Sequence, residues 1–368
     1  MFKLILILIP VLGVLFYMIF LSEDTQELIS PTIIEQNIQK ARQILPSPKI
    51  LSPKINLQIP PQSKILTGGI HVFQTFNNCG PASLSMTLSY FDINVTQQEL
   101  GQQLRPYHVR GGDNDDKSVT MEELAQKGEE YGLLAYHRPM GNLEMIKLFI
   151  TYDIPVIART WTKPNEDIGH YRVIKGYDGD TIIQDDSLQN KNLRFEVLEF
   201  NAMWDKFNFE YLVLVPKEKR DIAEAILDDN LDKSVAWKKA LNASLDQLAK
   251  NPNSITDSFN LSVAYFNTGE FQKSVEEFEK VEDKLPFRAL WYQIEPILSY
   301  YELGNYERVF QITEHVLNYY NRAFSELYLI RGHIYKNQGN YSLAQAEFEK
   351  AQFYNKNLQA TKDALNSL

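Results

Sequence analysis

Three glycines near the C-terminus recur at a constant interval, and they constrain the fold of that region more than any other feature. Gly269, Gly304 and Gly339 follow one another at intervals of 35 residues. Aromatic residues repeat in register around them, namely Tyr265, Tyr300 and Tyr335 before the glycines and Phe271, Tyr306 and Tyr341 after them. A glycine flanked by aromatic residues allows two helices to turn back and pack against each other. The period therefore predicts an all-α region of stacked helical hairpins.

This period resembles that of tetratricopeptide repeats, which are helical hairpins of about 34 residues. The third copy has the family's pattern of small, small, aromatic and small residues at Gly332, Ala344, Phe348 and Ala351. The resemblance implies tetratricopeptide-like repeats over residues 251–368, with a helical connector over residues 218–250 that caps the stack. Concave repeat surfaces often bind a protein partner or a peptide substrate, and three repeats are equally suited to a scaffold.

The N-terminus contains an apolar run that is long enough to cross a membrane. Leu4 to Leu21 are 18 consecutive uncharged residues, which at 1.5 Å per residue just span a bilayer core of about 30 Å. No A-x-A cleavage site follows the run, so we expect an uncleaved transmembrane anchor over residues 1–22, with a cleavable signal peptide as the alternative. Lys3 precedes the run, and the next positive charge is Lys40. The positive-inside rule therefore predicts a single-pass membrane protein with a cytoplasmic N-terminus and an extracytoplasmic bulk.

Two further regions lie between this anchor and the repeats. Residues 23–65 are expected to form a proline-rich tether, because extended chain is favoured by Pro46, Pro48, Pro53, Pro60 and Pro61. Residues 66–217 begin with helical patterns, including capping-box spacings at Thr96 with Glu99 and at Thr120 with Glu123. Short β-rich runs follow at Val156 to Trp161, Tyr171 to Tyr177, Thr181 to Gln184 and Tyr211 to Val215. Helices followed by an antiparallel sheet predict an α+β domain.

Charge and cysteine content exclude several classes of function. The formal net charge of −10 argues against nucleic acid as a partner. Cys79 is the only cysteine in 368 residues, which excludes internal disulfides, CxxC redox motifs and thiolate zinc clusters. We expect neither a metal nor a cofactor.

Cys79 stands where a nucleophile would be placed. It is followed by Gly80, Pro81 and an amphipathic helical pattern with Leu84 and Leu88 on one face. The first turn of a helix has unpaired N–H groups and partial positive charge, which favour a thiolate over a thiol. The alternative is a small buried hydrophobe, which is the usual role of a lone cysteine.

A thiol nucleophile needs a base and an orienting group, and His170 is the best placed of the six histidines to act as the base. It opens a predicted strand, and Asp185 and Asp186 end the next one. A hairpin that turns at Asp178 to Asp180 brings one of these aspartates beside His170. Only one of them can point at the imidazole, because neighbouring side chains alternate between the faces of a strand.

The runs that contain these residues are QTFNNCGP, GHYRVIKGYD and DDS, beginning at Gln74, Gly169 and Asp185. In combination they resemble the papain-like cysteine peptidases of the double-glycine, bacteriocin-processing type, over roughly residues 66–216. The resemblance implies a papain-like fold with Cys79 as the nucleophile and His170 as the general base and acid.

The same resemblance implies roles for three more residues. Asp186 would orient His170, because the family's aspartate usually precedes Pro or a small residue. Ser187 fills that place here, and Asp185 stays an alternative. Gln74 would donate its side-chain amide to the oxyanion together with the backbone N–H of Cys79. Gln74 lies five residues before the cysteine, where six is usual in the best-known members.

Two departures from this family bear on function. Its well-known members are fused to ABC transporters and act in the cytoplasm on leader peptides ending in Gly-Gly. This chain has no Walker A pattern, and its predicted anchor places the peptidase domain outside the cytoplasm. Double-glycine specificity is therefore not assumed. The preferred hypothesis is a membrane-anchored cysteine peptidase with partner-binding repeats. A non-hydrolytic peptidase-like binding or scaffold protein is the alternative, and an amide-forming or transferring enzyme is a third possibility.

Overall fold

A seven-stranded sheet organises the first part of the structure, a computed structural model that describes residues 55–107, 109, 113, 119–318 and 321–368. Five strands follow one another in the spatial order β2-β7-β3-β4-β5, β6 continues this order, and β1 pairs separately with β4. Every pairing is antiparallel. The strands are β1 (Ser63–Ile65), β2 (Leu134–Arg138), β3 (Val156–Trp161), β4 (Gly169–Asp178), β5 (Thr181–Asp185), β6 (Leu193–Glu196) and β7 (Tyr211–Val215).

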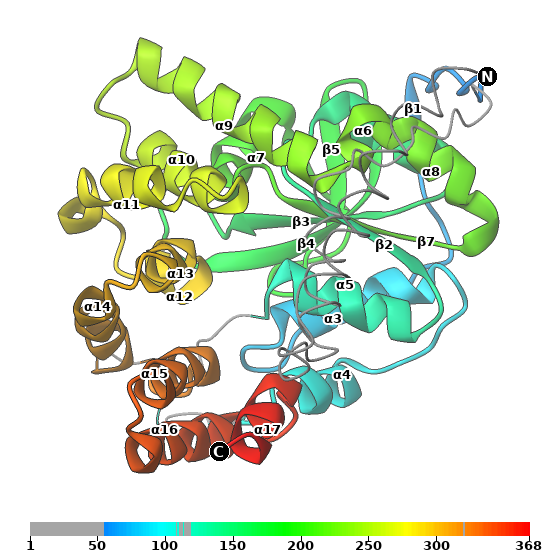
Figure 1. The fold of residues 1–368 in the computed structure, drawn as a ribbon. Coiled ribbons are helices and arrows are strands. Elements are labelled where there is room, and N and C mark those ends of the chain that lie inside the picture. The colour runs from blue at the N-terminus through cyan, green and yellow to red at the C-terminus, as the bar shows by residue number, and fades with distance from the viewer. Residues whose placement is uncertain (1–54, 108, 110–112, 114–118, 319–320) are drawn as a thin grey trace, which may run out of the picture. The chain divides into compact units, whose positions relative to one another are not determined.

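Helices cover both faces of this sheet (Figure 1). Alternation along β3 divides the core, since Val156 packs with one helical layer and Ile157 with the other. The layer packed with Ile157 contains α3 (Cys79–Ser89), α4 (Gln97–Leu104) and α5 (Met121–Glu130). The opposite layer contains α6 (Leu143–Thr151), α7 (Val197–Trp204) and α8 (Arg220–Leu227).

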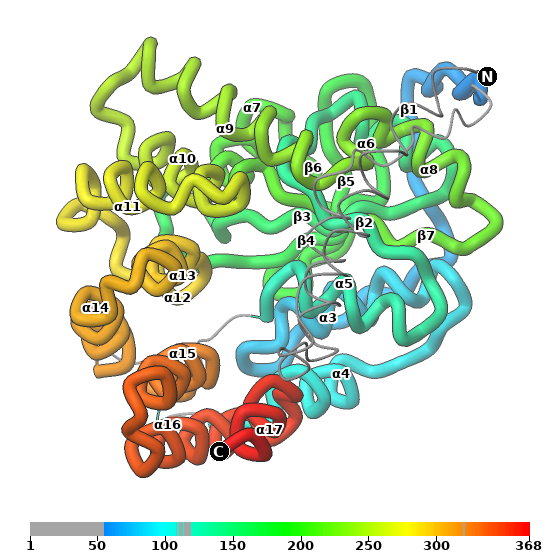
Figure 2. The backbone as a smooth tube through the Cα atoms, viewed as in Figure 1, coloured from blue at the N-terminus to red at the C-terminus, as the bar shows by residue number. Residues whose placement is uncertain are grey.

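Helices alone make up the C-terminal part of the described chain, as Figure 2 shows. They are α9 (Lys233–Lys250), α10 (Ile255–Asn267), α11 (Phe271–Glu279), α12 (Ala289–Tyr292), α13 (Glu295–Glu302), α14 (Tyr306–Asn318), α15 (Ser325–Asn337), α16 (Tyr341–Tyr354) and α17 (Gln359–Asn366). The predicted hairpins are α10 with α11, α13 with α14, and α15 with α16. Gly269, Gly304 and Gly339 lie at their turns with φ of 80°, 71° and 76°, a conformation that favours glycine. The 35-residue period thus marks the turns of three helical hairpins.

Both predicted capping boxes are confirmed at the starts of α4 and α5. The side chains of Thr96 and Thr120 accept hydrogen bonds from the backbone N–H of Glu99 and Glu123, and each glutamate side chain binds back to its cap. The fold class predicted for residues 66–368, an α+β domain followed by helical repeats, is also observed. The sequence patterns did not indicate β2, β6 or α7.

Two predicted boundaries differ from the structure. The tether expected over residues 23–65 ends earlier, because Ser63–Ile65 forms β1 and pairs with Asp178 to Gly176 of β4. The connector expected over residues 218–250 is divided between two environments. Ala223 and Leu227 of α8 are buried in the core beside the sheet, whereas α9 packs against α10 and so caps the repeats.

The predicted transmembrane anchor over residues 1–22 lies outside the described residues. Within the part of the chain that is described, no helix is both long enough and apolar enough to cross a bilayer.

Candidate active site

Cys79 is the first residue of α3, at the one end of this helix that is partly open to solvent. Every later residue of α3 is buried, so the helix is enclosed on all sides rather than amphipathic as predicted. The hydroxyls of its three serines donate hydrogen bonds to backbone carbonyls, such as that from Ser83 Oγ to the Tyr171 carbonyl at 3.2 Å. Gly80 permits close packing here, since a Cβ would lie 3.3 Å from Val119. The thiol is therefore held on a rigid helix at an accessible N-terminus.

The loop before Cys79 is fixed by the buried side chain of Gln97, which sequence reasoning did not identify. Gln97 Oε1 accepts from the backbone N–H of Thr75 at 2.8 Å, and its Nε2 donates to the Phe73 carbonyl at 2.7 Å. Asn78 Nδ2 donates to Thr75 Oγ1 at 2.8 Å. Asn77 has φ of 55°, a left-handed conformation that asparagine tolerates better than most residues. These contacts set the entry of the chain into α3.

His170 and Asp186 are brought together by the hairpin of β4 and β5, as predicted. His170 Nε2 lies 2.8 Å from Asp186 Oδ1, and the two side chains are only 2% and 0% exposed. The backbone N–H groups of Leu188 and Gln189 also donate to Asp186 Oδ1, at 2.7 and 3.1 Å. The carboxylate is thus oriented from two directions toward the imidazole.

Asp185, the alternative orienting acid, points elsewhere. Its carboxylate lies 2.8 Å from Lys175 Nζ and accepts the backbone N–H of Asn192 at 2.8 Å. The two neighbouring aspartates therefore occupy different environments, and Asp186 is the one beside His170.

Arg172 lies on the other side of Asp186 and was not identified from the sequence. Its Nη1 is 3.1 Å from Asp186 Oδ2, and both side chains are fully buried. Arg172 is itself fixed, because Nε donates to Thr160 Oγ1 at 2.9 Å and Nη2 to the Thr162 carbonyl at 2.7 Å. Spacing gave one signal for it, since residues 170 and 172 lie on the same face of a strand.

The pKa values of the three groups shift in a mutually consistent way. Burial raises the pKa of the Cys79 thiol, but its hydrogen bond with His170 and the charges of His170 and Arg105 outweigh burial and lower it. Burial lowers the pKa of His170, but the hydrogen bonds and charges of Asp186 and Cys79 raise it to about 9. Burial raises the pKa of Asp186, but His170, Arg172 and the N–H of Leu188 bring it down to about 2. The arrangement favours a thiolate beside an imidazolium.

Gln74 lies in the same cleft as Cys79 and His170. Ser187 holds it twice, since Ser187 Oγ donates to Gln74 Oε1 at 2.8 Å and the Ser187 carbonyl accepts the Gln74 N–H at 2.8 Å. Because the amide oxygen is engaged, the amide NH₂ is the group left to act as a donor. The five-residue spacing therefore still brings Gln74 to the site.

The cleft has a volume of about 260 Å³ and includes residues from the helical repeats. Gln74, Asn77, Cys79, Arg105, Ile168, Gly169, His170 and Leu188 line it from the sheet domain, and Arg288 and Tyr292 line it from the repeats. The sequence gave no signal for this contribution from the repeats, because it depends on how α12 packs against β4.

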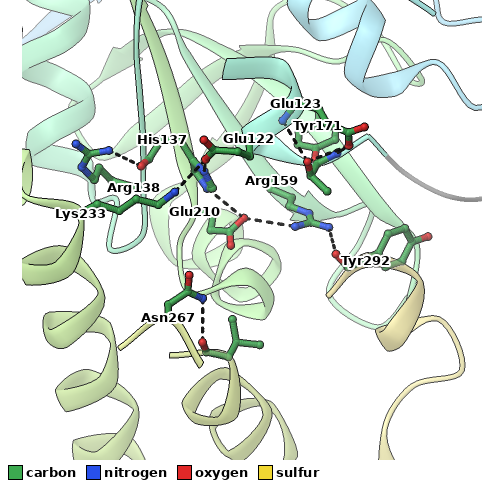
Figure 3. Close-up of polar contacts among 12 residues, drawn as sticks. Glu122, Glu123, His137, Arg138, Arg159, Tyr171, Glu210, Lys233, Asn267 and Tyr292 are labelled. Carbon is green, nitrogen blue, oxygen red and sulfur yellow. Dashed lines mark hydrogen bonds and ion pairs between the residues drawn. The ribbon is translucent and has the colours of Figure 1, made fainter. Parts of the chain in front are cut away.

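The other described histidines lie in different surroundings. His71 Nε2 contacts the Asp186 backbone carbonyl at 3.0 Å. His137 is near Glu122 and Glu210, and Figure 3 shows it on the opposite side of Arg159 from Tyr292. His315 and His333 belong to α14 and α15. Within the described residues, no group of three or more His, Cys, Asp or Glu side chains could hold a metal ion.

Comparisons with known proteins match two separate regions of the chain. Residues 56–212 match the model of the Peptidase C39-like family, and residues 325–356 match a tetratricopeptide repeat. One similar solved structure is a crystal structure of a C39-like peptidase from Bacillus anthracis, with 18% sequence identity and a TM-score of 0.37. The match covers 42% of this chain and 98% of the Bacillus anthracis chain. Another is the peptidase domain of Streptococcus ComA, a bi-functional ABC transporter involved in a quorum-sensing pathway, with 17% sequence identity and a TM-score of 0.33. The match covers 41% of this chain and 100% of the ComA chain. No curated protein matches. Two regions of the chain are therefore similar to known families, the first to the C39-like peptidases and the second to tetratricopeptide repeats.

Proposed function

We propose that this protein is a cysteine peptidase that hydrolyses peptide bonds with Cys79, His170 and Asp186. The observation that supports this most strongly is the relation of three buried or partly buried groups. A thiol with a lowered pKa begins a helix and shares a hydrogen bond with His170. The Nε2 atom of the same imidazole lies 2.8 Å from Asp186 Oδ1. Structural cysteines do not require such an arrangement, whereas nucleophilic ones do.

In the first half of the proposed reaction, the Cys79 thiolate attacks the carbonyl carbon of the scissile bond. The oxyanion that forms accepts hydrogen bonds from the Cys79 backbone N–H and from the amide NH₂ of Gln74. His170 then transfers its proton to the leaving nitrogen, the C–N bond breaks, and the acyl group remains on sulfur as a thioester.

In the second half, water replaces the departed amine in the cleft. Neutral His170 takes a proton from the water as the oxygen attacks the thioester carbon. The C–S bond then breaks, which releases the carboxylic acid product and restores the thiolate beside the imidazolium. Asp186 keeps the imidazole in one orientation throughout and stabilises its charged form.

The proposal includes a location for the enzyme. The uncharged run from Leu4 to Leu21 would anchor the chain, with the N-terminus in the cytoplasm and the peptidase domain outside. The repeats would bind a protein partner or part of the substrate.

Cleavage of a diverse peptide mixture, read by mass, tests the proposal. The wild-type protein should generate new termini, and Cys79→Ala should generate none while it retains the same thermal unfolding midpoint. Equal cleavage by both proteins, or binding of peptides without cleavage by either, would refute hydrolysis by Cys79.

A further inference from the structure

The repeats form one wall of the catalytic cleft through the segment that leads into and contains α12. Arg288 and Tyr292 line the same cleft as Cys79 and His170, although more than 100 residues separate them from either in sequence. Tyr292 packs directly on the strand that carries His170, since a Cβ on Gly169 would lie 3.0 Å from its ring. The absence of a side chain at residue 169 therefore allows the repeat segment to approach the site.

Hydrogen bonds also attach this wall to the sheet domain. Arg159 of β3 donates from Nη2 to the Tyr292 carbonyl at 2.6 Å, and its Nη1 lies 3.4 Å from Glu210 Oε2, as Figure 3 shows. Asp167, in the connection between β3 and β4, accepts from both the backbone N–H and the Nη1 of Arg288 at 3.2 and 2.7 Å. These contacts fix the position of Arg288 at the edge of the cleft.

The charge of the cleft is opposite to that of the whole chain. Two arginines, Arg105 and Arg288, are among the described residues that line it, and none of those lining residues is an aspartate or a glutamate. The chain itself carries a formal net charge of −10. A guanidinium has five N–H donors in one plane, which suits planar acceptors such as carboxylates. The Arg288 side chain uses Nη1 to donate to Asp167. Its other N–H groups can therefore donate to a carboxylate of the substrate.

We propose that Arg288, with Arg105 on the sheet-domain side, forms a subsite for an acidic side chain or a terminal carboxylate of the peptide substrate. The substrate class is then a peptide with a carboxylate close to the scissile bond, and the specificity is supplied jointly by the sheet domain and the repeats. This inference rests on the proposed peptidase function, but the anion preference of the cleft can be measured without hydrolysis.

Alkylation of Cys79 provides that measurement, because it is the only thiol in the chain. Iodoacetate and iodoacetamide are similar in size, and only the first carries a negative charge. The quantity to compare is the ratio of their rate constants, iodoacetate over iodoacetamide, at one pH and low ionic strength, with adducts read by intact mass. The reference is the same chain unfolded in urea. A positive cleft should raise the ratio of the folded protein above that of the unfolded chain.

Two substitutions break the same ion pair and should move this ratio in opposite directions. Arg288→Gln removes a positive charge and should lower it by about threefold, whereas Asp167→Asn removes a negative charge and should raise it by about the same factor. Arg288→Lys should stay near the wild-type value. Arg194→Gln, which removes an equal charge from β6 outside the cleft, should leave it unchanged. If Arg288→Gln and Asp167→Asn change the rate ratio in the same direction, the substitutions have displaced the wall. That result would overturn the assignment of the charge effect to Arg288.

Peptides that differ only by Asp or Asn near the cleavage site complete the test. The wild-type protein should cleave the Asp peptide with the higher kcat/KM, and Arg288→Gln should reduce that preference. If no peptide is cleaved but the alkylation ratio falls in Arg288→Gln, the peptidase function is refuted and the anion subsite is supported. Cleavage without preference, together with a ratio insensitive to both substitutions, would refute the subsite and retain the peptidase.

Discussion

His170 Nε2 lies 2.8 Å from Asp186 Oδ1, while the second oxygen of the same carboxylate lies 3.1 Å from Arg172 Nη1. The carboxylate is thus placed between a titratable imidazole and a permanently charged guanidinium. Arg172 keeps its proton, and its charge adds to the hydrogen bond and charge of His170 in lowering the pKa of Asp186 to about 2. An ionised Asp186 in turn keeps His170 protonated to a higher pH, and a protonated His170 favours the Cys79 thiolate.

The first prediction concerns pH. The pKa of Cys79 is lowered from 9.0 and that of His170 is raised to about 9, so the thiolate–imidazolium pair should exist across neutral pH. The kcat/KM for peptides should rise on an acid limb below the ordinary thiol range, as the thiolate forms. It should fall near pH 9, as His170 loses the proton that the leaving amine requires. Iodoacetamide rates should remain high at pH 7, whereas a rate that follows an ordinary thiol pKa would contradict this prediction.

Asparagine substitutions at the two neighbouring aspartates should separate their roles. Asp186→Asn removes the anion beside His170 and should lower kcat on the order of 10³-fold, with a lower pKa for His170 on the alkaline limb. Asp185→Asn disrupts the contact with Lys175 and should change kcat by less than about threefold. Steady-state kinetics of both variants, each checked for thermal stability, measure the difference. Equal losses would mean that the hairpin, and not the carboxylate beside His170, determines activity.

Arg172→Met should affect both stability and titration. It leaves the Asp186 charge buried beside His170 alone, and loss of one partner of a buried pair typically costs about 3–5 kcal/mol in the free energy of unfolding. The pKa of Asp186 should rise, because the Arg172 charge is one of the causes that lower it. Denaturant unfolding at pH 7 measures the first effect. Its pH dependence in the acid range measures the second, because a raised pKa of Asp186 moves the acid loss of stability to higher pH. A destabilised variant whose stability has the same acid dependence as the wild type would contradict the predicted rise in pKa.

Gln74 and Ser187 should act on the same step with different strength. Gln74→Ala removes the proposed oxyanion donor and should lower kcat by about 10²- to 10³-fold with little change in KM. Ser187→Ala removes only the hydroxyl that holds Gln74 Oε1, so its loss should be in the same direction and smaller. The double variant should lose no more than Gln74→Ala alone, because both changes act through one amide. Additive losses would show that Ser187 acts independently of Gln74.

The main elements of the fold could be predicted because their signals are local. The glycine period marks hairpin turns that have φ of 71° to 80°, and the threonine–glutamate pairs form capping boxes within single helix starts. Strands β3, β4, β5 and β7 have the β-rich runs expected of them. Strand β2, in contrast, is only partly buried at four of its five positions, and so lacks a clear apolar pattern.

The choice between Asp185 and Asp186 depends on a feature that the sequence does not reveal. An unbroken hairpin continuing from the pair Asp178 and Thr181 would place Asp185 opposite Ile174, on the same face as His170. The register instead shifts between Ile174 and Gly176, so Asp185 lies opposite Val173. A one-residue shift exchanges the faces, which places Asp186 on the side of His170.

The contribution of the repeats to the cleft was also beyond sequence reasoning. It requires Gly169 to accept the Tyr292 ring and Arg159 to hold the Tyr292 carbonyl, and these contacts join segments more than 120 residues apart. No local pattern specifies such packing.

The most direct test of the account is the cleavage of a defined peptide library by the wild-type protein and by Cys79→Ala, with new termini identified by mass. Cys79→Ser and His170→Ala, checked for an unchanged thermal midpoint, complete the set. We predict cleavage by the wild type alone, with an acyl adduct on Cys79 trapped at early times. Cleavage that persists in Cys79→Ala, or a folded wild type that cleaves nothing in the library, would contradict it.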